Sequence, residues 1–278
     1  MIPWTSLDEM IASFEVILFD SDGVLTRWPS AVPGAPEAIA RLNSLEKPYF
    51  VLTNDASALP ETRSARYAEL GLAIDPSRII TSGFLLKDYF SNLNLAGSRC
   101  VVLGTEDSAS YVREAGGEVV SFEKDFDVLV IGDQEGFPFL EATGKVLSNL
   151  FLKIDRGETP FLVVPNPDLI YPEGDGYNFA SGAVAQMFES AIALRYRDRM
   201  DLKFTRLGKP HPAMFEEAIS RCGTRHMVMI GDNPDTDIRG ANQAGITSVL
   251  VETGVATADP SELPEPDRPK YRMKSLAL

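Results

Sequence analysis

The sequence predicts an α/β protein with a parallel sheet and an inserted second α/β domain. Short apolar runs, each closed by polar residues, recur along the chain, and such runs are typical of strands that are buried on both faces. Helical patterns lie between these runs, and this alternation is typical of parallel sheets. The strands are too numerous for one compact core of ~150 residues, so we expect two units.

The expected elements follow in chain order. The apolar runs predict strands over residues 16–19, 49–52, 100–103, 127–131, 161–164, 227–230 and 248–251. The clearest helix spans 138–156, where the three-four spacing of one buried stripe is kept by Leu140, Thr143, Leu147, Leu150, Phe151 and Ile154. Polar stretches near 81–83 and 197–201 mark the expected edges of the inserted domain. We therefore expect a core of residues 1–83 and 203–278, and an insertion over 84–202.

Composition and charge exclude several classes of protein. The 278 residues are 44% apolar, which favours an ordered globular fold. A net charge of −14 opposes binding to nucleic acid. Cys100 and Cys222 are far apart, which argues against a disulfide framework or a thiolate metal site. No basic residue precedes Arg27 and no long apolar run occurs, so we expect a cytoplasmic protein with no membrane span.

The first apolar run ends in the segment D-S-D-G-V-L. It contains Asp20 and Asp22, which are two residues apart. On extended backbone this spacing places both carboxylates on the same side of the chain. Asp and Gly also favour turns after strands, so a plain turn explains the segment about as well.

Polar side chains follow two further strands. Thr53 and Asn54 come after the second run, and Asp232 and Asp237 come after the run at 227–230. Ligands in open α/β sheets bind outside the carboxyl ends of the strands, so these groups are expected to converge. Clustered aspartates without Cys or His form a hard oxygen site that suits Mg²⁺, which points to phosphate chemistry.

Phosphate binding among carboxylates also needs a cation from the protein. Lys209 stands in G-K-P directly before an expected helix, and a helix N-terminus favours anions. A solvated surface lysine is the simpler interpretation of Lys209 taken by itself.

The order of four segments, D-S-D-G-V-L, T-N, G-K-P and G-D-N-P-D-T-D, resembles the four motifs of the haloacid dehalogenase-like (HAD) phosphatases. Further segments are similar to subfamily IIA, whose large C2-type cap is inserted between the second and third motifs, as in NagD-like and 4-nitrophenylphosphatase-like enzymes. These segments are ITSG (80–83), NPD (166–168), LGKPHPAMF (207–215) and DTDIRGANQAGI (235–246). The resemblance implies a Rossmann-like core and an α/β cap.

The resemblance also implies roles for individual residues. Asp20 would be the nucleophile that forms an aspartyl-phosphate, and Asp22 the general acid and then the base. Lys209 would neutralise the charge shared by Asp20 and the phosphate. The implied magnesium ligands are the carboxylates of Asp20 and Asp232 and the main-chain carbonyl of Asp22. Asp237 would fix Lys209 or a metal-bound water, although a helix N-cap explains it equally well.

The implied substrate contacts come from both domains. They are made by Thr53, Asn54, Lys209, Asn166 and Asp168. A turn containing Pro167 explains the last two without the resemblance. Ser21 departs from the apolar residue that is common between the two aspartates of these enzymes, and the segment after NPD keeps Gly182 but otherwise diverges.

We therefore expect a Mg²⁺-dependent phosphatase that hydrolyses a small phosphorylated metabolite. The cap would exclude bulk water and macromolecular substrates. Two alternatives stay open. A phosphotransferase or mutase would use the same aspartyl-phosphate, and a non-catalytic phosphoacceptor would share the strand-end Asp, Thr and Lys.

Overall fold

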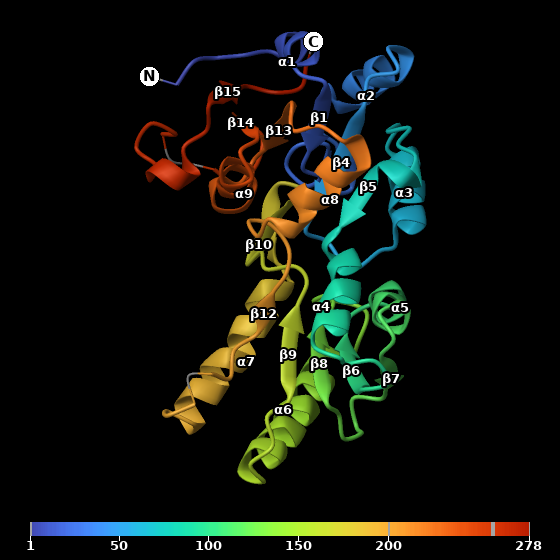
Figure 1. Ribbon diagram of the computed structural model, residues 1–278, viewed down its shortest axis with the longest axis vertical. Coiled ribbons are helices and arrows are strands. Elements are labelled where there is room, and N and C mark those ends of the chain that lie inside the picture. Colours follow the sequence, from blue (N-terminus) through green and yellow to red (C-terminus); the bar gives the residue numbers. More distant parts are fainter. Residues whose placement is uncertain (1, 200, 257–258, 278) are drawn as a thin grey trace.

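The computed structural model describes residues 2–199, 201–256 and 259–277. Figure 1 shows two lobes stacked along the long axis of the molecule, with both chain ends in the same lobe. Each lobe is built on one parallel sheet covered by helices on both faces. This confirms the α/β class with a Rossmann-like parallel-sheet core. Among the described residues, no helix is long and apolar enough to cross a bilayer.

The first lobe contains a six-stranded sheet. Its strands, in spatial order, are β15 (Tyr271–Met273), β14 (Thr247–Val251), β13 (Met227–Gly231), β1 (Val16–Phe19), β4 (Tyr49–Thr53) and β5 (Ile79–Thr81). Alternate side chains of β1 enter opposite cores: Ile17 and Phe19 face one cluster, while Val16 and Leu18 face the other. We call this lobe the core.

Helices pack on both faces of the core sheet. One face is covered by α1 (Leu7–Ser13), α2 (Ala35–Ser44) and α3 (Pro60–Glu69), and the other by α8 (Ala213–Cys222) and α9 (Arg239–Gln243). Local signals set the helix ends. Ser6 and Glu9 form a capping box at the start of α1, and α8 ends at Gly223, whose φ of 69° suits glycine.

The second lobe, which we call the cap, contains a five-stranded sheet. Its spatial order is β12 (Thr205–Arg206), β9 (Phe161–Val164), β8 (Val128–Ile131), β6 (Arg99–Leu103) and β7 (Glu118–Val120). One face carries α6 (Phe139–Asp155) and α7 (Ser181–Arg195), and the other carries α4 (Leu86–Asn92) and α5 (Glu106–Glu114). The insertion of residues 84–202 stays a prediction, and the pairing of β12 with β9 favours a boundary after Arg206.

Two antiparallel hairpins complete the fold. A flap in the core consists of β2 (Thr26–Arg27) and β3 (Ser30–Ala31), and a longer hairpin in the cap consists of β10 (Ile170–Glu173) and β11 (Gly176–Phe179). The longer hairpin lies in the divergent segment after NPD, where no apolar run predicts a strand.

The expected strands all form, but one detail of the long helix was wrong. Leu140 was expected in the buried stripe of α6, yet it is 86% exposed. The stripe begins instead with Ala142 and Thr143, followed by Val146, Leu150 and Ile154. At 3.6 residues per turn, Leu140 points about 160° away from Ala142, so the buried face of α6 is rotated relative to the one that the apolar spacing predicts.

Candidate active site

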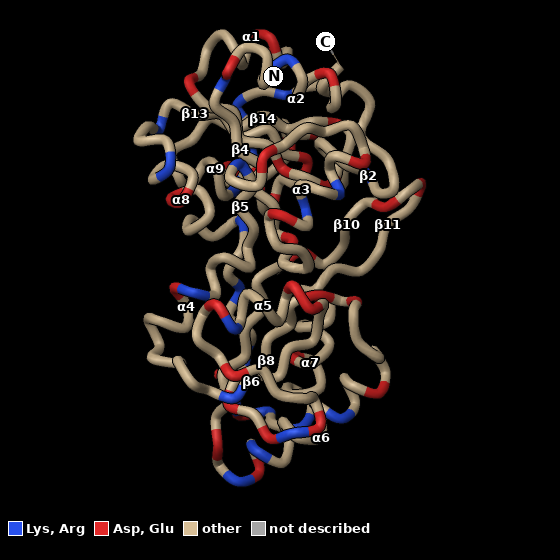
Figure 2. Tube along the Cα trace, turned by 90° about the vertical axis from the view of Figure 1, so that its right-hand side faces the viewer, with Lys and Arg blue, Asp and Glu red and all other residues tan. Residues whose placement is uncertain are grey.

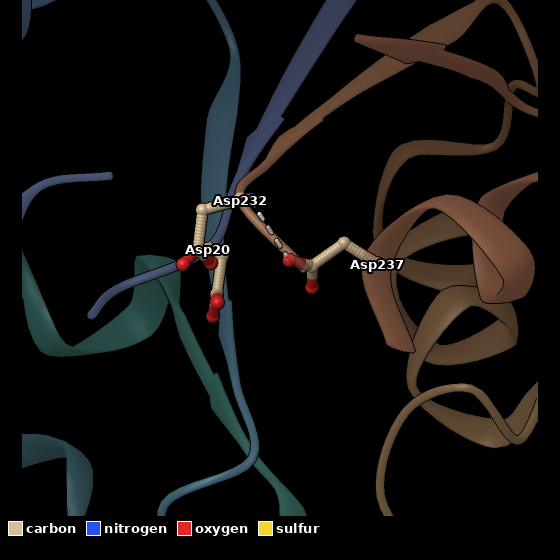
Figure 3. Close-up of side chains that lie close together, drawn as sticks. All are labelled: Asp20, Asp232 and Asp237. Atoms are coloured by element: carbon tan, nitrogen blue, oxygen red, sulfur yellow. Dashed lines mark hydrogen bonds between the residues drawn. The ribbon is translucent and has the colours of Figure 1, made fainter. Parts of the chain in front are cut away.

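The carboxyl ends of three core strands bring the expected acidic residues together. Asp20 follows β1, Thr53 ends β4, and Asp232 follows β13. Figure 3 shows Asp20 and Asp232 side by side, with Asp237 approaching from the turn before α9. One carboxylate oxygen from each of these aspartates lies within 4.8 Å of the others. The convergence expected from the strand ends is therefore present.

Lys209 lies at the centre of this cluster. Its Nζ donates to Oδ1 of Asp20 at 2.6 Å, to Oδ1 of Asp237 at 2.7 Å and to the carbonyl oxygen of Leu52 at 2.7 Å. The side chain is 1% exposed, so the surface-lysine interpretation was wrong. Burial alone would lower the pKa of Lys209, but the charges of Asp20 and Asp237 outweigh it and raise that pKa above its ordinary value. The ammonium therefore stays charged.

Asp237 holds both Lys209 and the end of β13. Its Oδ2 accepts the amide N–H groups of Asp232 and Asn233, each at 3.1 Å. Asn233, and not Asp237, caps the following turn by accepting the N–H of Asp235 at 3.0 Å. Burial and the charge of Asp20 raise the pKa of Asp237 to about 6, while Lys209 opposes this shift. Through its contact with Nζ, Asp237 can keep Lys209 in place.

Asp232 is a buried carboxylate whose charged form is destabilised. Its Oδ2 accepts the N–H of Val255 at 2.9 Å. Burial raises its pKa well above the ordinary value, and the charges of Asp20 and Asp237 add to this. Crowded carboxylate oxygens with no Cys or His in the cluster fit a hard divalent cation. The donor set therefore suits a hard divalent cation such as Mg²⁺, which the carboxylates of Asp20 and Asp232 could hold.

Asp22 and Thr53 line the same cleft. The hydroxyl of Thr26 donates to Oδ1 of Asp22 at 2.8 Å. Thr53 accepts the N–H of Asp55 through Oγ1 at 3.1 Å, which leaves the hydroxyl proton of Thr53 for an acceptor in the cleft. Each side chain is thus oriented by one neighbour and keeps one group for a ligand.

Asn54 links Lys209 to the cap. Its Oδ1 accepts the N–H of Lys209 at 2.7 Å, and its Nδ2 donates to the carbonyl oxygen of Lys209 at 3.1 Å and to the carboxylate of Asp168 at 3.1 and 3.2 Å. A Cβ on Gly208 would lie 2.4 Å from Oδ1 of Asn54, so glycine permits this close approach. Asp168 therefore reaches the core site across the cleft.

The two polar residues of NPD have different environments. Asn166 accepts the N–H of Asp168 through Oδ1 at 2.9 Å, which is the expected turn. Burial raises the pKa of Asp168 to about 7, with Lys209 opposing the shift and Asp20 adding to it. Both residues line the cleft. Asn166 and Asp168 can therefore form a turn and line the cleft at the same time. The charges of Lys209 and Asp20 in the core change the pKa of Asp168.

The cleft between the lobes has a volume of about 530 Å³. Its lining includes residues that were not predicted as site residues. These are Arg63, Arg66 and Tyr67 of α3, and Asp133, Gln134 and Glu135 after β8. Asp133 follows a buried strand, as Asp232 does, so the same signal could have identified it. The residues of α3 lie in no motif, and only the packing of α3 against the core sheet brings them to the cleft.

The cap hairpin closes one side of the cleft by touching the core flap. The N–H of Gly174 donates to the carbonyl oxygen of Trp28 at 2.8 Å, and the guanidinium of Arg27 lies 5.8 Å from the ring centre of Tyr177. Figure 2 shows β10 and β11 rising from the cap toward β2. The divergent segment after NPD thus forms part of the wall of the cleft.

Comparisons with known proteins show the family of this chain. A family model described as haloacid dehalogenase-like hydrolase matches residues 17–118, and a second HAD-hydrolase-like model matches residues 206–277. The chain is 31% identical to a dihydroxyacetone phosphatase of Corynebacterium glutamicum over 263 residues, which are 94% of this chain and 88% of that protein.

Solved structures with the same fold are also named as phosphatases. One is a possible sugar phosphatase of the HAD superfamily from Cytophaga hutchinsonii, with a TM-score of 0.86, 29% identity, and coverage of 100% of this chain and 99% of the other. Another is a glycerol phosphate phosphatase of Mycobacterium tuberculosis in complex with magnesium, with a TM-score of 0.78, 26% identity, and coverage of 96% and 77%. With its strand-end aspartates and its phosphatase relatives, the chain belongs to the haloacid dehalogenase-like hydrolases and is a phosphatase of their NagD-like group.

Proposed function

We propose that this phosphatase depends on Mg²⁺ and hydrolyses small phosphorylated polyols or sugars through an aspartyl-phosphate on Asp20. The observation that carries the proposal is the contact of Lys209 with Asp20 at 2.6 Å and with Asp237 at 2.7 Å, beside Asp232. A buried cation held between carboxylates supplies charge where a phosphate dianion must approach an anionic nucleophile. Bound Mg²⁺ would supply further charge neutralisation at the transferring phosphoryl group.

The first step forms the covalent intermediate. Lys209 donates to Oδ1 of Asp20, which leaves Oδ2 to attack phosphorus. As the new bond forms, the bond from phosphorus to the substrate oxygen breaks, and Asp22 gives its proton to that leaving oxygen. Thr53 donates its hydroxyl proton to a phosphoryl oxygen and Lys209 balances the negative charge, so both act most strongly as charge builds up.

The second step returns the enzyme to its starting state. Asp22, now ionised, takes a proton from water as the water oxygen attacks phosphorus, and the bond between Asp20 and phosphorus breaks. Inorganic phosphate leaves, and Asp22 is protonated again. The contact of the cap hairpin with the flap limits access of bulk water during this cycle.

The lining of the cleft supports a small hydroxylated substrate. The cap side contributes Asp133, Gln134, Glu135 and Glu173. Carboxylate and amide groups accept hydrogen bonds from substrate hydroxyls, whereas a second anionic group near them would be repelled. The relatives named above act on dihydroxyacetone phosphate, sugar phosphates or glycerol phosphate according to their names.

The test is a screen for phosphate release from phosphorylated polyols, sugars and sugar acids, with MgCl₂ and after chelation. We expect turnover of neutral polyol or sugar phosphates only with the metal present. Absence of release from every substrate in the presence of Mg²⁺ would contradict the proposal. Transfer of the phosphoryl group to added alcohols in place of water, seen as new phosphate esters, would favour the phosphotransferase alternative.

A further inference from the structure

A chain of buried hydroxyl groups connects α3 with the carboxyl group of Asp22. The phenol of Tyr67 donates to Oγ of Ser21 at 2.7 Å. Oγ of Ser21 lies 3.4 Å from Oγ1 of Thr26, and Thr26 donates to Oδ1 of Asp22 at 2.8 Å. The exposed fractions of Tyr67, Ser21 and Thr26 are 1%, 0% and 1%, so these hydroxyl groups are shielded from water.

The hydrogen-bond direction along this chain follows from the number of protons. The single hydroxyl proton of Thr26 goes to the carboxylate at 2.8 Å in preference to the carbonyl oxygen of Ser21 at 3.4 Å. Oγ1 of Thr26 can therefore only accept from Ser21, and Ser21 in turn accepts from Tyr67. Burial raises the pKa of Tyr67 to about 12, which keeps the phenol a donor. All the donors point toward Asp22.

The backbone fixes Thr26 opposite Asp22. The carbonyl oxygen of Ser21 accepts the N–H groups of Leu25 at 2.8 Å and Thr26 at 2.9 Å, and the N–H of Gly23 donates to the carbonyl oxygen of Thr26 at 2.7 Å. This tight loop sets the Thr26 side chain beside the carboxyl group independently of any substrate. The link from Ser21 to Thr26 is long for a hydroxyl hydrogen bond, so it is the weakest of the three.

We propose that Tyr67, Ser21 and Thr26 are positioning residues that hold Oδ1 of Asp22 as a hydrogen-bond acceptor and leave Oδ2 to carry the proton for the leaving group. This inference rests on the proposed function, in which Asp22 is the general acid. No proton moves along the hydroxyl chain. The proton on Oδ2 passes to the substrate oxygen as its bond to phosphorus breaks, and the hydroxyl groups stay as they are.

This arrangement gives a physical reason for Ser21. An apolar residue at that position would leave the buried phenol of Tyr67 without its acceptor and Thr26 without a donor, and a buried unpaired hydroxyl is destabilising. Ser21 and Tyr67 are separated by 46 positions, so the pair forms only when α3 packs against the loop after β1. A merely structural pair would contribute to stability alone, whereas a positioning pair also changes the response to the leaving group.

The test compares substrates that differ in their need for protonation. We would measure kcat/KM, which includes the transfer of phosphate to Asp20 but not the later hydrolysis, for 4-nitrophenyl phosphate, phenyl phosphate and glycerol phosphate. T26V should lower kcat/KM about thirtyfold for glycerol phosphate and less than about threefold for 4-nitrophenyl phosphate, because 4-nitrophenolate leaves without a proton. T26S, which keeps the hydroxyl, should stay within about twofold of the wild type for both.

Tyr67→Phe and Ser21→Ala act on Asp22 only through the 3.4 Å contact between Ser21 and Thr26. Each should lower kcat/KM for glycerol phosphate about three- to fivefold more than for 4-nitrophenyl phosphate. A double variant tests whether Tyr67 and Thr26 act through the same series of hydrogen bonds or independently. Tyr67→Phe should cause no further selective loss in the T26V protein, since the connection to Asp22 is already broken. Tyr49→Phe is the matched control, because Tyr49 is a buried tyrosine of the core whose hydroxyl donates to Asn43 at 3.0 Å, away from the cleft. It should change both substrates equally.

Equal losses on all three phosphates, or additive effects in the double variant, would overturn the positioning role. So would a Tyr67→Phe variant whose leaving-group response matches that of Tyr49→Phe. If T26V does not fold, the comparison of Tyr67→Phe with Tyr49→Phe decides the question alone, since both changes remove one oxygen. Failure of the wild type to release phosphate would contradict the proposed function instead, and so the two failures are distinguishable.

Discussion

The core side and the cap side of the cleft differ in how firmly their side chains are held. On the core side, Lys209 donates to three acceptors at 2.6 to 2.7 Å, and both carboxylates that pair with it are nearly or fully buried. On the cap side, the hairpin that faces the flap carries Tyr177 and Phe179, which are 51% and 74% exposed.

This difference separates chemistry from recognition. Charges that must stabilise a transition state act best when they are fixed in advance, because no reorganisation is then needed during the reaction. A recognition surface that meets the remote part of a substrate contributes through binding and can vary with that substrate. We therefore expect substitutions of Asp20 and Lys209 in the core to change kcat for every substrate, and substitutions in the cap to change only kcat/KM for particular ones.

The largest effect is expected for Asp20→Asn. The amide is a far poorer nucleophile than the carboxylate, and Lys209 loses one charged partner, so kcat should fall by about 10³-fold or more for every substrate. Phosphate release by the purified variant, with unchanged circular dichroism, checks this. Retention of more than about a tenth of the wild-type kcat, a loss below ~1.4 kcal/mol, would show that Asp20 is not the nucleophile.

Removing the buried cation should reveal how strongly the core side depends on it. Lys209→Met keeps the length of the side chain but leaves Asp20 and Asp237 without their shared partner, so the free energy of unfolding should fall by about 3–5 kcal/mol. Urea denaturation measures this change. Activity should be lost together with stability.

The cap provides a matched lysine for this measurement. Lys153 is 5% exposed in its side chain and pairs with Asp125 at 3.0 Å and Glu158 at 2.6 Å, but these partners are 47% and 44% exposed. Lys153→Met should therefore cost only about 1 kcal/mol, because water can solvate the carboxylates that are left. Equal losses in the two methionine variants would contradict the contrast between the two sides.

Asp168 and Asn166 test where the boundary between chemistry and recognition lies. Asp168→Ala removes the link to Asn54 across the cleft and should lower kcat/KM for the best metabolite about tenfold, with 4-nitrophenyl phosphate changing less than about threefold. Asn166→Ala removes one turn hydrogen bond and should have a smaller effect on the metabolite. A large and equal loss on both substrates in Asp168→Ala would assign this residue to the catalytic machinery or to closure of the cap.

The last prediction concerns the pH dependence of stability. Burial raises the pKa of Asp133 to about 6 in the folded cap, from 3.8 for an exposed aspartate. The folded state then holds this proton more tightly than the unfolded state, so this residue lowers stability as the pH rises from about 4 to 6. Asp133→Asn removes that penalty and should stabilise the protein by about 1–3 kcal/mol at pH 8.

Thermal melting at pH 5 and pH 8 checks how the stabilisation by Asp133→Asn changes with pH. The gain of the variant over the wild type should be larger at pH 8 than at pH 5, because at pH 5 the wild-type carboxyl group is largely protonated. A gain that shrinks as the pH rises would contradict a raised pKa. Lowered kcat/KM for polyol phosphates in the same variant would place Asp133 on the substrate-binding surface.

Local pattern determined the strands and the motif positions. Short continuous apolar runs predicted β1, β4, β6, β8, β9, β13 and β14, since a strand that is buried on both faces has to be apolar throughout. The clustering of Asp20, Thr53 and Asp232 was predicted as well, because parallel strands present their carboxyl ends at one edge of the sheet. Short elements with mixed polarity, such as β10, β11 and β12, carry no such pattern and were not predicted.

The sequence by itself determined the fold class, the family and the identity of the charged groups, because those depend on residue type and short spacing. Tertiary structure alone decided how the groups are paired. Lys209 and Asp20 are 189 positions apart, Asn54 and Asp168 are 114 apart, and Tyr67 reaches Ser21 from a helix outside every motif. Such contacts depend on which faces of separate elements pack together, and the free energy of that packing comes from the whole buried core and not from the residues that meet.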